Sequence, residues 1–292
     1  MKQNKIVLES IFWFDIFEWP FTKTELWRFS PVRENLIISK PEKTEMESID
    51  SFNGFYFLQG KKSLFEKRIL RQKIVIKKLK IAKKAAEILS FIPFIKMIAL
   101  CNDVAYFNAP KESDIDFFIV AKSGKIWTVR ILSVMALFFF GIWRHKKKIK
   151  DRICLSFFVC DDNLDIETFS YENDILLKYW TPNHFPLFSR EKTYQKFLES
   201  NQWIKNDFPN YFKNIPSPKI RVQQKIFQIL SEKLLNNNVG NVIEKFFKAV
   251  QLQIMGKKAP WQKDKDVIIS DKILKFHEND RRKYFKKIFE EK

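Results

Sequence analysis

The chain has 292 residues, of which 46% are hydrophobic, and a formal net charge of +19. This composition excludes a disordered protein and leaves room for one substantial core and a second small one. The positive charge suits nucleic acid, anionic lipid or phosphate-rich ligands, but the joint abundance of Lys, Phe, Ile and Asn is also typical of an A/T-rich coding sequence. Charge alone therefore does not identify the partner.

Three cysteines, Cys101, Cys154 and Cys160, lack the spacing of a zinc site or of a disulfide framework. They indicate buried thiols in a reducing compartment. The start of the chain, "MKQNKIVLESIFWF", has no apolar region followed by a small-residue cleavage site. We therefore expect a cytoplasmic protein.

Residues 1–60 predict a small winged-helix-like module. A helix over residues 5–17 ends at Trp19-Pro20, and Thr22 or Thr24 caps a second helix that reaches Phe29. "GFYFLQG" predicts an alternating strand. The candidate third helix, "EKTEMESID", carries four acids against one lysine, so DNA phosphates would repel it. We expect the module to serve packing or protein interaction and not DNA reading.

Residues 61–93 predict a connecting segment that is helical from 61 to 89. Its charges between residues 61 and 84 are positive except for Glu66, and few aromatic residues interrupt them. An apolar stripe at helical spacing is formed by Ile69, Ile76, Leu79 and Ile88. A connecting helix with a solvated basic face is the simpler interpretation. A surface that follows the phosphates of RNA or DNA is the alternative, without a platform for base stacking.

The stretch "SDIDFFIV", residues 113–120, places Asp114 and Asp116 at the start of an apolar strand. Residues two apart in a strand project to the same face, so the two carboxylates lie side by side. They repel each other unless a cation lies between them, and Mg²⁺ takes such oxygen ligands together with phosphates. The alternative is a pair of solvated charges at the mouth of the strand.

The segments around this pair have a recognisable order. "FIKMIALC" predicts a strand, residues 102–107 a turn with a short helix, and "NAPKES" a loop before the D-x-D strand. This order resembles the core of the DNA polymerase β-like nucleotidyltransferase superfamily. "FDIFEWPFTKTELWRF", "SNQWIKNDFPNYF" and "SDKILKFHENDRR" are similar to segments of uncharacterised bacterial nucleotidyltransferase-domain proteins that have a winged-helix-like module at the N-terminus. The resemblance implies a nucleotidyltransferase-like core over residues 94–200.

The resemblance also implies a metal site. Asp114 and Asp116 would be the catalytic pair and would hold Mg²⁺ or Mn²⁺. The family takes a third carboxylate from a later strand, but the next strand-like run, "RICLSFFV", contains no acid. Asp151, directly before that run, is the candidate third ligand. The alternative is a metal site that is incomplete.

The nucleotide phosphates would lie at the first turn, where the family has Gly-Ser and this chain has Asn102-Asp103. Asn can adopt the left-handed backbone of such a turn. The Asp103 carboxylate would repel a triphosphate. Ser113 and Lys111 are further candidates for nucleotide binding. Lys111, Lys122 or Lys125 would neutralise developing charge, and spacing alone does not choose among them.

Residues 131–143, "ILSVMALFFFGIW", are followed by the basic run "RHKKKIK". The apolar run is shorter than the ~20 residues that span a bilayer. We expect a buried helix that lies on the sheet, and no integral membrane insertion. A helix at the membrane surface with a basic flank is the alternative.

Residues 201–292 predict a helical C-terminal region with a break at "NNNVGN". Ser270 is expected to cap a final helix over residues 271–290. His277 and Asp280 fall on one stripe of that helix, most simply as a packed face with a hydrogen-bonded histidine. A proton-handling or phosphate-facing pair is the alternative.

Together these segments predict an α+β fold: a nucleotidyltransferase-like mixed sheet with flanking helices, an N-terminal winged-helix-like module and a helical C-terminal region. The expected function is metal-dependent transfer of a nucleoside monophosphate from a nucleoside triphosphate to an unknown acceptor hydroxyl, weak or lost in this chain. One alternative is a non-catalytic nucleotide- or nucleic-acid-binding pseudoenzyme, and a second is a membrane-surface protein. Non-specific nucleic acid is the further expected partner, and the sequence names no protein partner.

Overall fold

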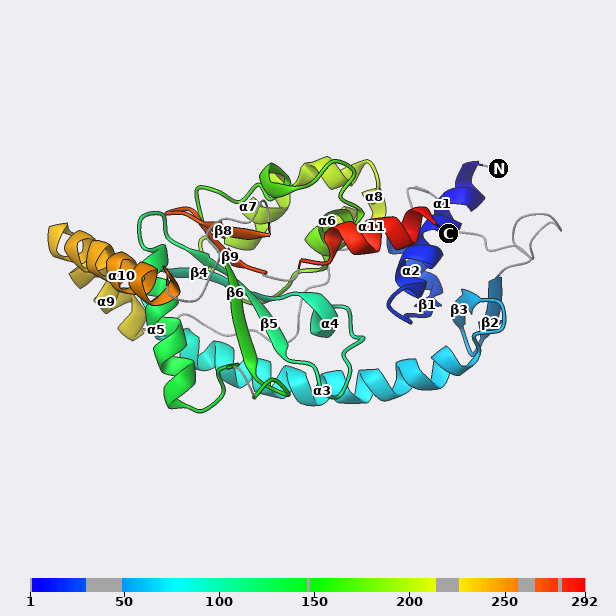
Figure 1. Cartoon of the computed structure of the whole chain (residues 1–292), viewed down its shortest axis with the longest axis horizontal. Helices are drawn as coiled ribbons and strands as arrows, with labels where there is room; N and C mark the ends of the chain where they lie inside the picture. Colours follow the sequence, from blue (N-terminus) through cyan, green and yellow to red (C-terminus); the bar gives the residue numbers. More distant parts are fainter. Residues whose placement is uncertain are drawn as a thin grey trace.

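A computed structural model describes residues 2–29, 49–145, 148–213, 226–256, 266–277 and 280–291. The described chain is an α+β protein with a six-stranded mixed sheet, in the order β7-β4-β5-β6-β9-β8, and a separate three-stranded sheet (Figure 1). The large sheet is made of β4 (Ile95–Leu100), β5 (Ile115–Ala121), β6 (Ile153–Cys160), β7 (Phe185–Ser189), β8 (Val267–Ile269) and β9 (Ile273–Phe276). β5 and β6 are parallel, and the other neighbouring strands of this sheet are antiparallel in the described residues.

Helices cover both faces of this sheet. Phe117 and Ile119 of β5 share a core with α3 (Ser63–Leu89) and α5 (Ile126–Phe139). Phe118 and Val120, on the other face, share a core with α6 (Ile175–Trp180) and α7 (Thr193–Ser200). Burial on both faces explains why the central strands are unbroken apolar runs.

The N-terminal part contains α1 (Lys2–Asp15), β1 (Phe21–Thr22), α2 (Lys23–Arg28), β2 (Ile49–Phe52) and β3 (Phe55–Leu58), with the strands in the order β1-β3-β2. The predicted cap of the second helix is confirmed: Thr22 accepts from the backbone N–H of Glu25, and the Glu25 side chain accepts from that of Thr22. The candidate third helix falls largely outside the described residues, and its last two positions, Ile49 and Asp50, begin β2.

The long helix predicted over residues 61–89 is confirmed as α3, which connects the small sheet to the large one (Figure 1). Arg68 donates to Glu25 over 2.7 Å, and Arg71 donates to Glu18 over 2.8 Å. These ion pairs fasten the N-terminal elements to the helix. Some of its basic residues therefore have an internal role.

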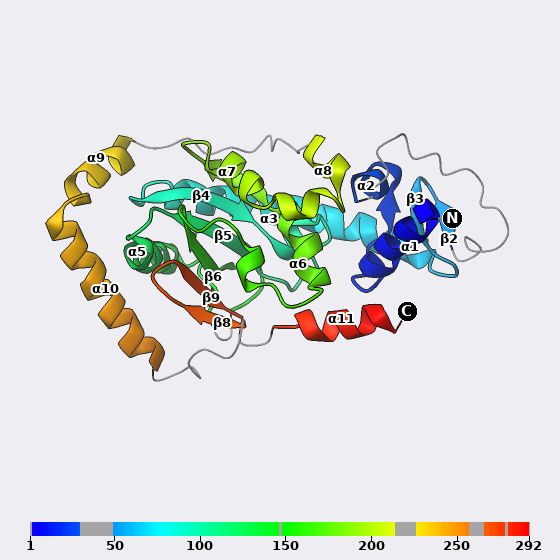
Figure 2. The ribbon, with the colours of Figure 1, turned by 90° about the horizontal axis from the view of Figure 1, so that it is seen from above.

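At the opposite end of the sheet lie α9 (Ile226–Leu235) and α10 (Asn238–Gly256), and α10 packs on α5 (Figure 2). The remaining elements are short: α4 (Asn102–Ala105), η1 (Glu167–Phe169), η2 (Thr181–Asn183), η3 (Gln202–Lys205), α8 (Pro209–Lys213) and α11 (Arg282–Glu290).

The final helix predicted over residues 271–290 is wrong in its first half. Residues 273–276 form β9, which pairs with β6, and helix α11 begins only at Arg282. Ser270 does not cap a helix, because its hydroxyl accepts from the backbone N–H of Ile273 in the turn between β8 and β9. β9 covers an edge of β6 that would otherwise expose unpaired backbone groups. The C-terminal region is therefore part of the sheet.

The apolar stretch near residue 131 forms α5, which begins and ends earlier than expected and is only partly buried. Trp127 and Leu137 are buried, as predicted for a helix that lies on the sheet. Apart from Leu137, the end of the helix is exposed: the exposed fractions are 58% for Met135, 64% for Phe138, 85% for Phe139 and 55% for Phe140. Among the helices that the model describes, we find none with the length and apolarity needed to cross a membrane.

Candidate functional site

The D-x-D pair meets a cysteine from the neighbouring strand. β5 and β6 run parallel, and their register places Asp116 opposite Cys154. One ligand atom each from Asp114, Asp116 and Cys154 lie within 4.8 Å of one another. A thiol therefore lies beside the two carboxylates, where the resemblance implies a third acid.

Asp151, the expected third acid, has another partner. Its carboxylate accepts from the buried Lys78 ammonium over 2.7 Å, and Lys78 also donates to the backbone carbonyls of Ser113 (2.6 Å) and Lys111 (3.4 Å). The Ser113 hydroxyl donates to the Pro110 carbonyl over 3.0 Å. These contacts fix the loop before β5, so the structure brings Asp151 to Lys78 and not into the group around Asp114.

Arg144, the first residue of the basic run after α5, is a site residue that the sequence pattern did not indicate. Its Nε lies 3.0 Å from a carboxylate oxygen of Asp114, and its Nη1 donates to the Cys154 sulfur over 3.2 Å. A backbone bridge between Trp143 and Ile153 brings this segment beside β6. A guanidinium thus neutralises part of the charge at the D-x-D pair.

Asn102 supports Asp116 from the turn after β4. Its φ is 54°, the left-handed conformation expected for this position. Its side-chain oxygen accepts from the Trp180 indole over 2.7 Å, and its side chain is hydrogen-bonded to Asp116. Trp180 and Asn102 therefore hold the Asp116 carboxylate in one orientation.

The site is electrostatically costly without a cation. Burial, and next the charge of Asp114, raise the pKa of Asp116 to about 7. Burial raises the pKa of Asp103 to about 6, against the opposing effect of Arg71. Burial also raises the pKa of the Cys154 thiol to about 12. Each of these groups would become fully charged more readily beside a bound cation.

Asp116 and Asp103 line a cavity of about 420 Å³. The N-terminal helix, α4, α6 and α11 contribute to its walls. Its aromatic lining includes Trp13, Phe17, Trp19, Phe157, Trp180 and Phe285. The carboxylates of Asp103 and Asp116 therefore face a space with many aromatic walls, which also has charged residues in its lining.

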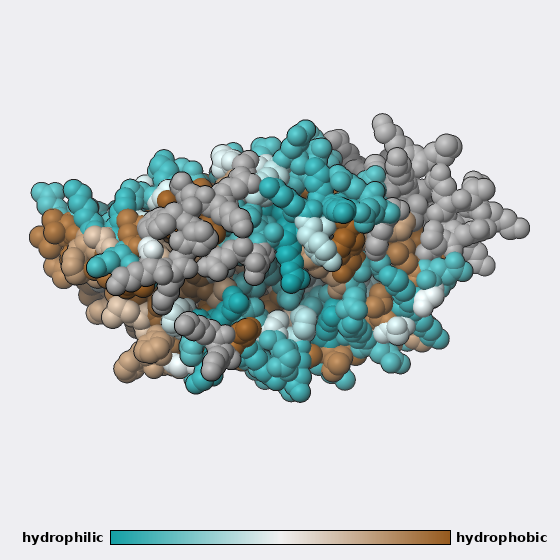
Figure 3. All heavy atoms as spheres, viewed as in Figure 1, coloured by the Kyte–Doolittle hydropathy of each residue, from teal (hydrophilic) through white to brown (hydrophobic). Residues whose placement is uncertain are grey.

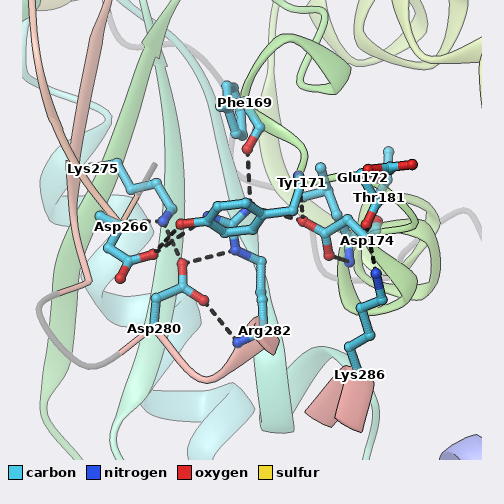
Figure 4. Close-up of polar contacts among 11 residues, drawn as sticks. Phe169, Tyr171, Glu172, Asp174, Thr181, Asp266, Lys275, Asp280, Arg282 and Lys286 are labelled. Atoms are coloured by element: carbon cyan, nitrogen blue, oxygen red, sulfur yellow. Dashed lines mark hydrogen bonds and ion pairs between the residues drawn. The ribbon is translucent and has the colours of Figure 1, made fainter. Parts of the chain in front are cut away.

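A buried network closes another side of the cavity (Figure 4). Asp280 accepts from Lys275 over 2.7 Å and from Arg282 over 2.9 Å, and Arg282 also donates to Asp174 over 2.9 Å. Tyr171 donates to Asp266 over 2.7 Å. These ion pairs tie β9 and α11 to the segment around α6. The cations of the network are thus held by protein carboxylates.

His277 and Asp280 do not lie on one helix stripe, but both line the cavity. His277 Nε2 and Ser156 Oγ are hydrogen-bonded at 3.3 Å, and burial lowers the pKa of His277 to about 4. The expected hydrogen bond of the histidine is confirmed, whereas the packed helix face is wrong, because His277 follows β9 and lines the cavity.

Lys122 and Lys125 lie too far along the chain to serve the D-x-D pair. Both follow the opposite end of β5, where Lys122 donates to Asn236 and Lys125 to Asn241. A strand advances by about 3.3 Å per residue, so a seven-residue strand separates these lysines from Asp114. Of the three lysines that were alternatives for neutralising charge at the site, these two are therefore excluded by their position.

No protein-family model, curated protein or solved structure matches this chain.

The chemistry of the donors indicates which ion the site fits. Two carboxylates suit Mg²⁺ and Mn²⁺, whereas a cysteine sulfur suits softer ions than Mg²⁺. The oxygen pair therefore fits a divalent cation, and Mn²⁺ matches the three-residue set better than Mg²⁺.

Proposed function

We propose that this chain is a nucleotidyltransferase-type protein that binds a nucleoside triphosphate with a divalent cation held by Asp114 and Asp116, and that its transfer activity is weak. The observation that carries the proposal is the convergence of these carboxylates and Cys154 beside a cavity with aromatic walls. The order β4, α4, β5 agrees with the order that the resemblance implies, and the order β1-β3-β2 agrees with a winged-helix-like module.

A bound cation would neutralise phosphate charge and polarise the α-phosphate. Asn102 and Trp180 orient Asp116, and the aromatic rings of the cavity offer surfaces on which a nucleobase can stack. In the transfer step an acceptor hydroxyl oxygen forms a bond to the α-phosphorus while the bond to the pyrophosphate oxygen breaks. The hydroxyl proton is released to water.

A second candidate function is nucleotide binding without transfer. Arg144 lies 3.0 Å from Asp114 and 3.2 Å from the Cys154 sulfur, so a fixed positive charge contacts two of the three metal-ligand candidates. This contact competes with a cation for Asp114. Asp103 adds a carboxylate at the turn where phosphates would lie. Both features oppose efficient phosphoryl chemistry, which depends on charge neutralisation around the reacting phosphate.

The test uses each of the four nucleoside triphosphates, labelled at the γ-phosphate, which leaves with pyrophosphate, and adds Mn²⁺ or Mg²⁺. Calorimetry measures binding, and release of pyrophosphate measures transfer. Slow release that Asp114→Asn with Asp116→Asn abolishes supports the proposal. Binding without release supports the second candidate. Absence of both binding and release contradicts both functions.

A further inference from the structure

Helix α9 turns a polar side to the protein and most of its apolar side chains to the solvent. The amphipathic helix of a water-soluble protein normally turns its apolar side to the core. In α9 the fully buried residue is Gln228, which donates to the carbonyls of Ile92 (2.8 Å) and Ile95 (3.2 Å). Glu232, one turn later, accepts from Arg190 over 2.9 Å. The outward side chains are apolar, with exposed fractions of 58% to 76%: Ile226, Phe227, Leu230 and Leu234.

Helix α10 also makes polar contacts with the core side, next to the partly buried Phe247, Leu252 and Met255 that pack against the core. Glu244 accepts from the backbone N–H groups of Trp127 (2.9 Å) and Thr128 (2.8 Å) at the start of α5. The buried Gln251 donates to the Trp127 carbonyl over 2.9 Å and accepts from Arg130 over 2.7 Å. Polar side chains thus attach the helix to the protein. Its large exposed hydrophobic residues are Val239, Val242, Phe246 and Ile254.

These two helices and the exposed last turn of α5 lie at the same end of the molecule in both ribbon views (Figures 1 and 2). Figure 3 shows hydrophobic residues gathered at that end. We call this surface the apolar end. Its members are Met135, Phe138, Phe139 and Phe140 with the outward residues of α9 and α10. Exposed apolar surface of this extent marks an interaction site.

Basic side chains border the apolar end. The second half of α3 packs beside α5, and between residues 73 and 89 its only acid is Glu87. Lys233 and Lys245, on α9 and α10, are exposed. The exposed lysines of that half of α3 are Lys73, Lys77, Lys80, Lys83 and Lys84. The surface therefore combines apolar side chains with a positive border.

We propose that the apolar end docks on an anionic lipid surface. The apolar side chains would enter the boundary between headgroups and acyl chains, and the lysines would contact lipid phosphates. Stable attachment at an interface needs two such signals, and this end of the molecule supplies both. A second copy of the chain fits less well, because each copy carries a formal net charge of +19. This inference is independent of the nucleotide site.

The test is flotation of the full chain with vesicles of phosphatidylcholine, alone or with about one third phosphatidylserine, the anionic lipid that attracts basic segments. We expect binding to the anionic vesicles at least about tenfold tighter than to the neutral ones. Phe138→Ser with Phe139→Ser and Phe140→Ser should weaken it by about tenfold or more, since three exposed aromatic side chains are lost. The matched control is Leu70→Ser, which removes an exposed apolar residue from the first half of α3 and should leave binding unchanged.

Charge is tested separately with Lys77→Glu, Lys80→Glu and Lys84→Glu, which should weaken binding to the anionic vesicles and not to the neutral ones. Circular dichroism of each variant verifies that it folds. Vesicle binding that the phenylalanine variant does not change would overturn the proposal. So would absence of vesicle binding together with a dimer, measured by light scattering, that the same variant dissociates, because the apolar end would then bind a second copy.

Discussion

Three carboxylates, those of Asp103, Asp114 and Asp116, are concentrated between the end of β4 and the start of β5. The charge of Asp114 raises the pKa of both Asp103 and Asp116, in addition to the effect of burial. Arg144 offsets part of this charge through its contact with Asp114, and Arg71 opposes the shift at Asp103. The free energy of the folded state is therefore higher than it would be with a cation at this site.

The buried carboxyl of Asp103 makes the stability of the folded state depend on pH. Its pKa is about 6 when folded and 3.8 in the absence of burial, so the folded state binds the proton more tightly. Stability therefore falls as the pH rises from about 4 to 6, and the full penalty is present above that range. We expect Asp103→Asn to raise the free energy of unfolding at pH 7–8 by about 1–3 kcal/mol, and to change it little near pH 4. Urea titrations without metal measure this difference, and equal effects at both pH values would contradict the account.

Cys154 lies beside Asp114 and Asp116, where a third carboxylate would complete the proposed metal site. We expect Cys154→Asp to raise the affinity for Mg²⁺ by about tenfold or more, because an oxygen ligand replaces sulfur. Cys154→Ser is the matched control, since it changes the donor atom without adding charge. Calorimetry with Mg²⁺ compares the two variants with the wild type. If the aspartate variant binds Mg²⁺ no better than the serine variant, residue 154 is not at the position of a third metal ligand.

The left-handed turn at Asn102 could be anticipated, because Asn adopts this backbone more readily than most residues and the resemblance places a Gly here. The contacts of Cys154 and Arg144 were not. They depend on the register of two parallel strands and on a bridge between Trp143 and Ile153, which local sequence does not encode. Asp151 was a reasonable candidate for the third metal ligand by its position, but its carboxylate accepts a hydrogen bond from the buried Lys78.

Among the elements, helix α3 was predicted from the spacing of its apolar residues. Which of its basic residues are buried and which are exposed was not predicted. Arg68 and Lys78 are buried and bind other parts of the chain, whereas Lys77 is exposed. One helix thus supplies both internal fasteners and a solvated basic surface. Which lysine has which role depends on the elements that pack against the helix.

Lys78 provides the prediction for this element. Lys78→Met leaves Asp151 and two backbone carbonyls without their donor, so we expect the free energy of unfolding to fall by about 1–3 kcal/mol. The neighbouring Lys77→Met is the matched control, with an expected change within about 0.5 kcal/mol at an exposed position. Urea denaturation measures both. Similar changes in the free energy of unfolding of the two variants would show that the buried contacts of Lys78 do not stabilise the fold.

Strand β9 was missed for a related reason. "ILKF" is short, and Ser270 precedes it in a pattern typical of a helix start. The strand forms because it pairs with β6, more than a hundred residues earlier in the sequence. A partner so distant in the sequence overrides the local helix signal.

At the scale of the whole molecule, the two ends of the chain build the cavity together. Trp13 of α1 lies against Phe285 and Phe289 of α11, with ring centroids 6.4 and 5.9 Å apart (Figure 1 shows both termini at one end). Trp13 and Phe285 also line the cavity beside Asp116. The N-terminal elements are therefore part of the candidate site as well as a separate small sheet.

The net charge leads to a prediction about nucleic acid. Any binding should be electrostatic and independent of sequence, because neutralised phosphates release counterions, and affinity should fall steeply between about 50 and 200 mM salt. Lys73→Glu with Lys77→Glu and Lys80→Glu should weaken it, since these lysines are exposed. Arg71, which contacts Glu18 and Asn108, should matter for stability instead. Fluorescence anisotropy with oligonucleotides of several sequences measures this, and a salt-insensitive, sequence-selective complex would contradict the prediction.

The central claim is that Asp114 and Asp116 hold a divalent cation beside the cavity. Titration with Mn²⁺ in the presence of a nucleoside triphosphate, followed by electron paramagnetic resonance, tests it most directly. We predict that the wild type binds Mn²⁺. Asp114→Asn with Asp116→Asn should weaken this binding by about tenfold or more, because both carboxylate ligands are lost. Asp151→Asn should leave Mn²⁺ binding unchanged, because Asp151 is bound to Lys78. Equal Mn²⁺ binding by the wild type and the double variant, or no binding by either, would contradict the claim.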